Sequence, residues 1–211
     1  MITKFDKYIN ESVRDKMTPK SEDDIIKALQ GLDQYQRMYK AIEHGILSLV
    51  EQIIENGIDL KKNVGGGTPA GDSFVDNAVQ YGKLDILKYL LDNGCDLDNS
   101  EDHQLGISIE KGYYDIAKFL VNEYGASVDD GEGDVYLQMA VEHNNLDLVK
   151  LVIDMDCHYF EKDWFNDIIL IDETNSEIIK YMMEKISGTK EFVEQMYNDY
   201  KEGVKIIEKY V

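Results

Sequence analysis

A short pattern recurs along most of this chain, and a repeat of this kind constrains the fold more than any other feature. Four segments align without a gap: Ala41–Ile54, Ala78–Leu91, Ser108–Val121 and Ala140–Ile153. A weaker fifth copy runs from Leu170 to Met183. One position, which we call the turn position, is held in the five copies by Gly45, Gly82, Gly112, Asn144 and Thr174, at spacings of 37, 30, 32 and 30 residues. Units this short cannot bury their own apolar side chains, so they must stack on each other.

Apolar residues within each copy fall at helical spacing. A small or apolar pair, such as Ala78-Val79, comes before the turn position, where Gly or Asn tolerates the left-handed conformation that ends a helix. The segment after it places apolar residues at i, i+4 and i+5, as in Ile86, Leu90 and Leu91. A second glycine then follows, at Gly57, Gly94 and Gly125. Each copy is therefore predicted to be a pair of short helices, with no strand.

Two stretches carry a resemblance to a known family: GKLDILKYLLDNGCDLDN, from Gly82, and GYYDIAKFLVNEYGASVDD, from Gly112. They resemble ankyrin repeats, and the similarity extends over about residues 38–183. It implies an all-α, ankyrin-like solenoid of helix pairs, with four clear repeats and a divergent fifth. The Thr-Pro pair that usually opens the first helix of such a repeat is missing, and its places are taken by Ser73-Phe74, His103-Gln104 and Val135-Tyr136.

The predicted organisation has three parts: an N-terminal helical segment over residues 1–31, the repeat array over 32–187, and an amphipathic helix over 188–211. Ser21 is expected to cap a helix that reaches about Gln30. We interpret both ends as helical caps that cover the array. A docking or sorting segment is the alternative for residues 1–31, and a dimer helix is the alternative for residues 188–211.

The string ESVRDKMTPKSEDDI, from Glu11, is similar to N-terminal leaders of large bacteriophage and other viral proteins. This similarity favours a viral protein that acts in the cytoplasm of a host. The first residues lack the long apolar run of a signal peptide or a membrane anchor. A cytoplasmic location is therefore expected.

The charge of the chain is strongly negative. Asp and Glu total 42 against 22 Lys and Arg, so the net charge is −20. Such a surface repels nucleic-acid phosphates, which disfavours direct binding of DNA or RNA. It attracts a basic protein surface. An acidic mimic of nucleic acid, which blocks a DNA- or RNA-binding protein, is the alternative.

No residue set predicts catalysis, a cofactor or a metal. Cys95 and Cys157 do not have metal-ligand spacing, and His44 and His143 lie on repeats that do not touch. The glycine run in KKNVGGGTPAGD, from Lys61, lacks the Lys-Ser/Thr pair of a phosphate loop, so we interpret it as a surface loop. The expected function is therefore non-enzymatic.

The resemblance also implies where a protein partner binds. In ankyrin-like proteins the partner usually contacts the hairpin tips and the end of the first helix. By register, the partner-binding residues expected here are Glu43, His44, Gln80, Tyr81, Asp102, Glu110, Lys111, Glu132, Asp134, Glu142, His143, Trp164, Asp172 and Glu173. The set is mostly acidic and includes two aromatic residues, which predicts an acidic concave face for a basic partner surface.

Overall fold

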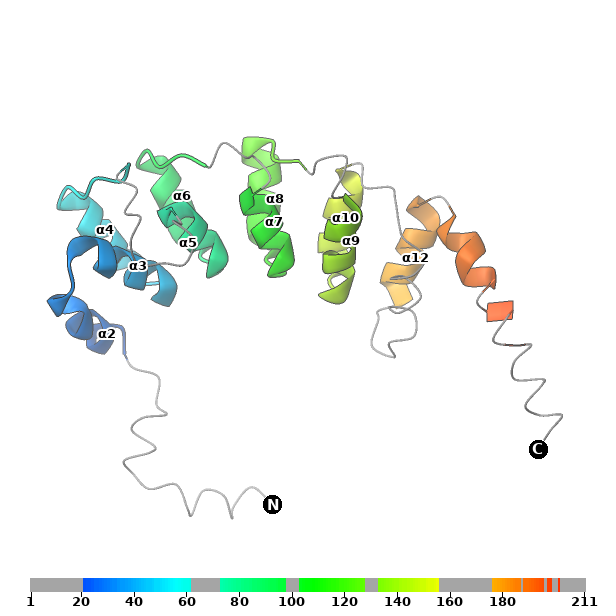
Figure 1. The fold of residues 1–211 in the computed structure, drawn as a ribbon, viewed down its shortest axis with the longest axis horizontal. Helices are drawn as coiled ribbons and strands as arrows, with labels where there is room; N and C mark the ends of the chain where they lie inside the picture. The colour runs from blue at the N-terminus through cyan, green and yellow to red at the C-terminus, as the bar shows by residue number, and fades with distance from the viewer. Residues whose placement is uncertain are drawn as a thin grey trace, which may run out of the picture.

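Every regular element that the computed structural model describes is a helix. The described residues are 21–61, 73–97, 103–127, 133–155, 176–186, 188–195, 197–198 and 201. Figure 1 shows the helices standing side by side in a curved row, from α2 (Glu22–Ala28) at one end toward α12 (Ser176–Lys185) at the other. The predicted all-α solenoid is confirmed.

The row is built from helix pairs. The pairs are α3 (Gln34–His44) with α4 (Leu47–Glu55), α5 (Phe74–Gln80) with α6 (Leu84–Asp92), α7 (His103–Glu110) with α8 (Tyr114–Tyr124), and α9 (Gly133–Glu142) with α10 (Leu146–Asp154). The first helices pack in succession, α3 on α5, α5 on α7 and α7 on α9, to form an inner layer. In the outer layer α4 packs on α6, α8 on α10, and α10 on α12, which stands where a fifth copy places its second helix.

Side chains cap the start of several helices, whereas α4, α6 and α8 begin without a side-chain cap. Asp33 caps α3 through the backbone N–H groups of Tyr35 and Gln36, and Asn145 caps α10 in the same way. At Ser73, a reciprocal capping box with Asp76 opens α5 without the Thr-Pro pair. The predicted cap at Ser21 is confirmed, although α2 stops at Ala28 and a 3₁₀ turn, η2 (Leu29–Gly31), completes the segment.

The core lies between the two layers. In the second helices the apolar residues predicted at i and i+4 are fully buried, as with Ile86 and Leu90. The i+5 residue is half-buried at the margin of the core in three copies, at Ile54, Leu91 and Val121, and is buried in the fourth, at Ile153. Burial of each such side chain contributes about 1.5–3 kcal/mol, and most of it requires a neighbouring repeat.

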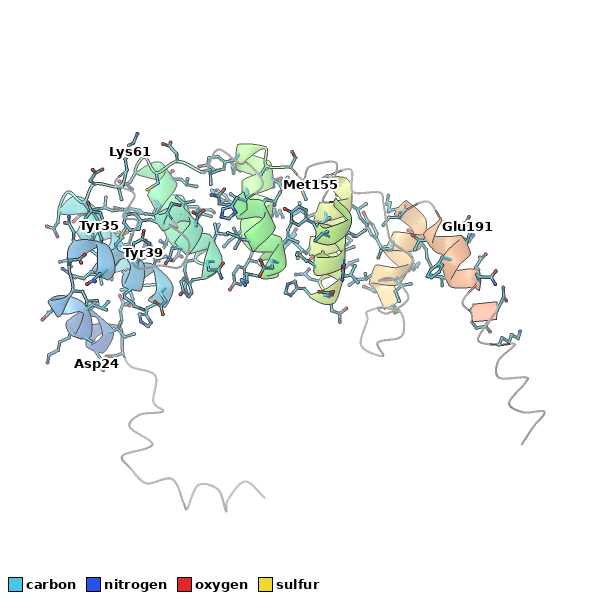
Figure 2. All side chains as sticks on the ribbon, in the orientation of Figure 1. Asp24, Tyr35, Tyr39, Lys61, Met155 and Glu191 are labelled. Atoms are coloured by element: carbon cyan, nitrogen blue, oxygen red, sulfur yellow. The ribbon has the colours of Figure 1, made fainter. Side chains whose placement is uncertain are left out.

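Contacts between successive repeats recur in register in the inner layer. Positions can be counted back from the turn position of each repeat. The residue eight positions before the turn of one repeat contacts the residue six positions before the turn of the preceding repeat. The ring of Phe74 thus lies 4.9 Å from that of Tyr39, centroid to centroid, and Tyr39 is labelled on α3 in Figure 2. In the next interface Gln104 donates from Nε2 to Oδ1 of Asp76 across 2.7 Å, and both side chains are buried. In the third, the Tyr136 hydroxyl lies 2.8 Å from where a Cβ on Gly106 would stand.

Further helical segments lie against both ends of the array. Near the N-terminus, Leu29 of η2 is buried, and the Ser48 hydroxyl donates to Oε1 of Glu22 across 2.6 Å. Near the C-terminus, residues 189–195 are helical, and Phe192 and Val193 pack on the core. Residues 1–20 and most of 199–211 lie outside the described residues, so the three-part division stays a prediction. None of the described helices has the length and apolar character needed to cross a membrane.

Candidate protein-binding edges

The helix pairs give the array two long edges. We call the turn edge the side where each first helix ends and its partner begins, at Gly45, Gly82, Gly112 and Asn144. We call the connection edge the side where each second helix ends and the chain passes to the next repeat. In Figure 2 the connection edge runs along the upper side, where Lys61 and Met155 are labelled.

Eight of the predicted partner-binding residues lie together on the turn edge. They are the last residues of the first helices or the residues directly after them: Glu43, His44, Gln80, Tyr81, Glu110, Lys111, Glu142 and His143. Glu43 and Lys111 are half-buried, and the other six are exposed. Tyr81, the large aromatic residue of this set, is 41% exposed.

The turn edge is closed by side chains that reach back from the following repeat. A Cβ on Gly45 would lie 3.1 Å from Nζ of Lys83, and one on Gly82 would lie 2.9 Å from Cζ of Tyr113. At Gly112 the same atom would lie 2.8 Å from Nδ1 of His143. All three glycines have a positive φ, between 67° and 72°. Glycine is therefore required here both by the backbone and by the close approach of the next repeat.

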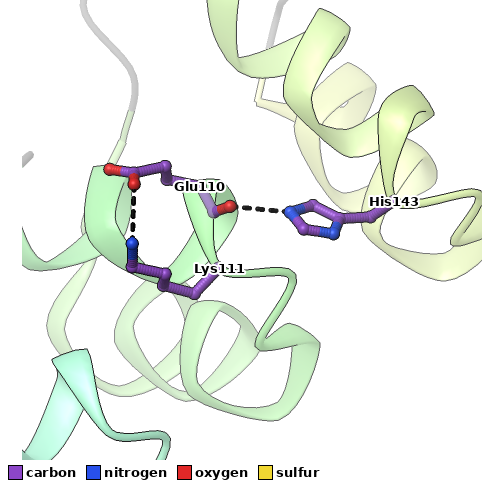
Figure 3. A network of polar contacts seen from close by, with 3 residues as sticks. All are labelled: Glu110, Lys111 and His143. Atoms are coloured by element: carbon purple, nitrogen blue, oxygen red, sulfur yellow. Dashed lines mark hydrogen bonds and ion pairs between the residues drawn. The ribbon is translucent and has the colours of Figure 1, made fainter.

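Figure 3 shows the tightest of these closures. The Nε2–H of His143 donates to the backbone carbonyl of Glu110 in the preceding repeat, across 2.7 Å. Beside it, the Glu110 carboxylate accepts from Nζ of Lys111 at 2.8 Å, and this bond and the nearby charge raise the pKa of Lys111 above its usual 10.5. His143 thus joins two repeats while its ring stays accessible.

The carboxylates of the turn edge have partners. Glu43 pairs with Lys40, Glu110 pairs with Lys111, and Glu142 accepts a hydrogen bond from the amide of Gln138 at 2.9 Å. Two of the three negative charges are therefore offset by an adjacent cation. This edge is less acidic than the count of its carboxylates suggests.

Five of the remaining predicted residues lie outside the described residues: Asp102, Glu132, Trp164, Asp172 and Glu173. Asp134 lies in the first turn of α9, at the opposite end of that helix from Glu142. A binding face that unites the whole set stays a prediction.

A row of carboxylates on the connection edge was missed in the sequence. Glu55, Asp92, Glu123, Asp154 and Glu184 stand at or next to the ends of second helices, and all are exposed. None forms an ion pair with a described residue. The signal was present, since four of these acids lie ten residues after the turn position and Glu123 lies eleven after it. Helix C-termini carry partial negative charge, which adds to the potential of this row.

The glycines of the connection edge are open. Gly57, Gly94 and Gly125 have φ values of 82°, 89° and 68°, but a Cβ on any of them would meet no atom within 4 Å. Cys95 follows Gly94 and is half-buried. Burial, and then the charge of Asp96, raises the pKa of its thiol to about 11. Within the described residues, no three His, Cys, Asp or Glu side chains are grouped as metal ligands.

Comparison with known proteins agrees with the repeat architecture. A family model for ankyrin repeats (3 copies) matches residues 38–132 and 75–163, which together make up more than half of the chain. No curated protein matches the sequence. The helix pairs, their register and this match lead to one conclusion: the chain belongs to the ankyrin-repeat family, whose repeats are in general protein–protein interaction modules.

Proposed function

We propose that this chain is a non-enzymatic binding module that holds a partner protein through a basic surface of that partner. The observation that supports the proposal best is the row of exposed carboxylates at the ends of the second helices, none of which has a cation partner among the described residues. A partner that brings lysine or arginine to this row gains attraction from several repeats at once. The net charge of −20 acts in the same direction over a longer range.

The proposal is tested by affinity purification of the full chain from its native cell, followed by quantitative mass spectrometry. Wild type is compared with Tyr81→Ala and Trp164→Ala, the two aromatic positions of the expected face. We expect wild type to enrich a small set of basic proteins and one of the variants to lose them. An identical set of partners in all three samples would exclude these residues from the binding surface. Captured proteins without basic surfaces would contradict the proposal.

We further propose that the chain acts as a viral adaptor or inhibitor of a host factor, in the host cytoplasm. This rests on the similarity of residues 11–25 to viral leaders, and those residues lie mostly outside the described part of the chain. Fractionation of cells that express the tagged chain tests the location. Recovery in the nuclear or membrane fraction would contradict it.

A nucleic-acid mimic is the second candidate, and the acidity of the chain is what favours it. Two edges with carboxylates at repeated intervals offer a partner a spaced series of negative charges, as phosphates do. Competition decides between the two functions: duplex DNA or RNA displaces the chain from a captured partner if the chain occupies a nucleic-acid site. We expect such binding to weaken steeply with salt. Binding that is independent of salt and unaffected by nucleic acid removes this candidate.

A further inference from the structure

One place on the connection edge combines aromatic rings with unpaired carboxylates. Tyr124, the last residue of α8, is 47% exposed, the most exposed of the large apolar side chains that the structure describes within the repeat units. Its ring packs edge-on against Phe119, with centroids 5.6 Å apart and planes at 67°. Both residues lie on the outer layer, away from the inner helices.

One ring of this aromatic pair already has a cation of the chain beside it. Nζ of Lys88, from α6 of the preceding repeat, lies 5.0 Å from the centroid of Phe119. Cations over an aromatic face are held by the negative charge of the ring's π system. The chain itself thus places an ammonium group on one ring of this pair, while the second ring, Tyr124, remains open to solvent.

Two carboxylates complete the surroundings of Tyr124. Asp92 lies one helical turn after Lys88, and Glu123 lies one turn after Phe119, so the contact of Lys88 with Phe119 brings both carboxylates to the end of the array's outer layer where Tyr124 stands. Burial and the charges of Asp92 and Glu123 raise the pKa of the Tyr124 phenol. Asp92 ends α6 and Glu123 belongs to α8, so two successive repeats contribute. Neither carboxylate forms an ion pair with a described residue.

We propose that Tyr124, Asp92 and Glu123 form an outer-layer site that binds an arginine side chain of the partner protein. Guanidinium is planar, stacks on an aromatic ring and can donate to a carboxylate through two parallel hydrogen bonds. Next to Tyr124, a Cβ on Gly125 would meet no atom within 4 Å, so a partner backbone can approach there. This inference rests on the proposed function and adds to it the surface and the chemistry of the contact.

The test uses the full chain and a labelled peptide of alternating arginine and glycine, with a second peptide in which citrulline replaces each arginine. Citrulline keeps the planar shape of arginine but is uncharged, and a carbonyl oxygen replaces one of the terminal nitrogen donors. Fluorescence anisotropy at low and high salt gives the affinities. We expect the arginine peptide to bind, the citrulline peptide to bind at least about tenfold more weakly, and salt to weaken the arginine peptide.

The variants locate the site. Tyr124→Ala should weaken the arginine peptide by about three- to tenfold, and Asp92→Asn with Glu123→Gln by a similar factor or more. Tyr124→Phe retains the ring and should bind as wild type does, which separates loss of the contact from loss of folding. Tyr197→Ala is the control, because Tyr197 is an exposed tyrosine outside the repeat units and outside the expected binding residues. It should leave the affinity unchanged.

Three outcomes overturn the inference: citrulline binding as well as arginine, Tyr124→Ala without effect, or Tyr197→Ala weakening the peptide as much as Tyr124→Ala. If Tyr124→Ala has no effect while affinity purification still yields basic partners, the proposed binding function stands and only the outer-layer site is wrong. If affinity purification yields partners without basic surfaces, the proposed function fails whatever the peptide does.

Discussion

The two edges of the array have the same backbone geometry but different surroundings. Glycines with positive φ end helices on both edges. On the turn edge, Lys83, Tyr113 and His143 each cover the glycine of the repeat before, and the carboxylates are paired. On the connection edge nothing approaches the glycines, and the acids at the helix ends have no ion-pair partner among the described residues. The turn edge is closed by contacts between successive repeats, whereas the connection edge is open.

The largest effect should come from adding a methyl group to one glycine on each edge of the same repeat. Ala has to adopt a left-handed conformation at both Gly112 and Gly125, with φ of 72° and 68°, at a cost of about 1–2 kcal/mol. At Gly112 the methyl group also meets the His143 ring, which adds about 1–3 kcal/mol. Urea unfolding followed by circular dichroism measures the difference. Equal losses at the two positions would show that His143 does not close the turn edge.

The next effect separates two histidines in the same register position. His143→Ala removes the hydrogen bond to the Glu110 carbonyl and should lower the free energy of unfolding by about 0.5–1.5 kcal/mol. His44 has no repeat before it to bridge, so His44→Ala should change stability by less than about 0.5 kcal/mol. Thermal melts of both variants provide the measurement. A larger loss at His44 would mean that closure does not depend on a preceding repeat.

A smaller effect of opposite sign is expected at the two ends of α10. Asp147 lies in the first turn of the helix and pairs with Lys150 at 3.5 Å, whereas Asp154 is its last residue. Asp147→Asn should therefore destabilise the protein and Asp154→Asn should stabilise it, each by about 0.3–1 kcal/mol at low salt. Both differences should shrink in high salt. Destabilisation by Asp154→Asn would mean that this carboxylate has a structural partner.

The last effect concerns Cys95 on the connection edge and is confined to alkaline pH. Its pKa of about 11 keeps the thiol protonated when an unfolded thiol, near 9.0, has already ionised. The stability that this group contributes is present below pH 9 and is lost as the pH rises toward 11. Alkylation of Cys95 by iodoacetamide, followed by mass spectrometry against pH, should show an apparent pKa well above 9, and Asp96→Asn should lower it. Half-maximal alkylation near pH 9 in wild type would contradict the burial of the thiol.

The helix pairs could be predicted from the sequence because their causes are local. Spacings such as Ile86 to Leu90, and glycine at the turn position, specify helix and turn without knowledge of the neighbours. The start of α5 was harder to predict, because the Thr-Pro pair is missing there. Ser73 and Asp76 cap the helix instead, through reciprocal hydrogen bonds.

The candidate site depended on more than register. The sequence placed Glu43 and Asp134 in one acidic face, and in the structure Glu43 lies near the end of α3 whereas Asp134 lies in the first turn of α9. The pairing of a carboxylate depends on the cations that the fold brings near it, as in the ion pair of Glu43 with Lys40 one turn earlier on α3. The acids at the ends of the second helices recur in register in the sequence. That they form a row became clear only from the structure, which places those helix ends on one edge.

The closure of the turn edge runs in one direction along the chain. Each covering side chain comes from the later repeat and rests on the earlier one, so deleting a repeat at the C-terminal end uncovers a glycine turn, whereas deletion at the N-terminal end does not. Because synthesis starts at the N-terminus, the turns at Gly45, Gly82 and Gly112 can each be covered only after the following repeat has been made.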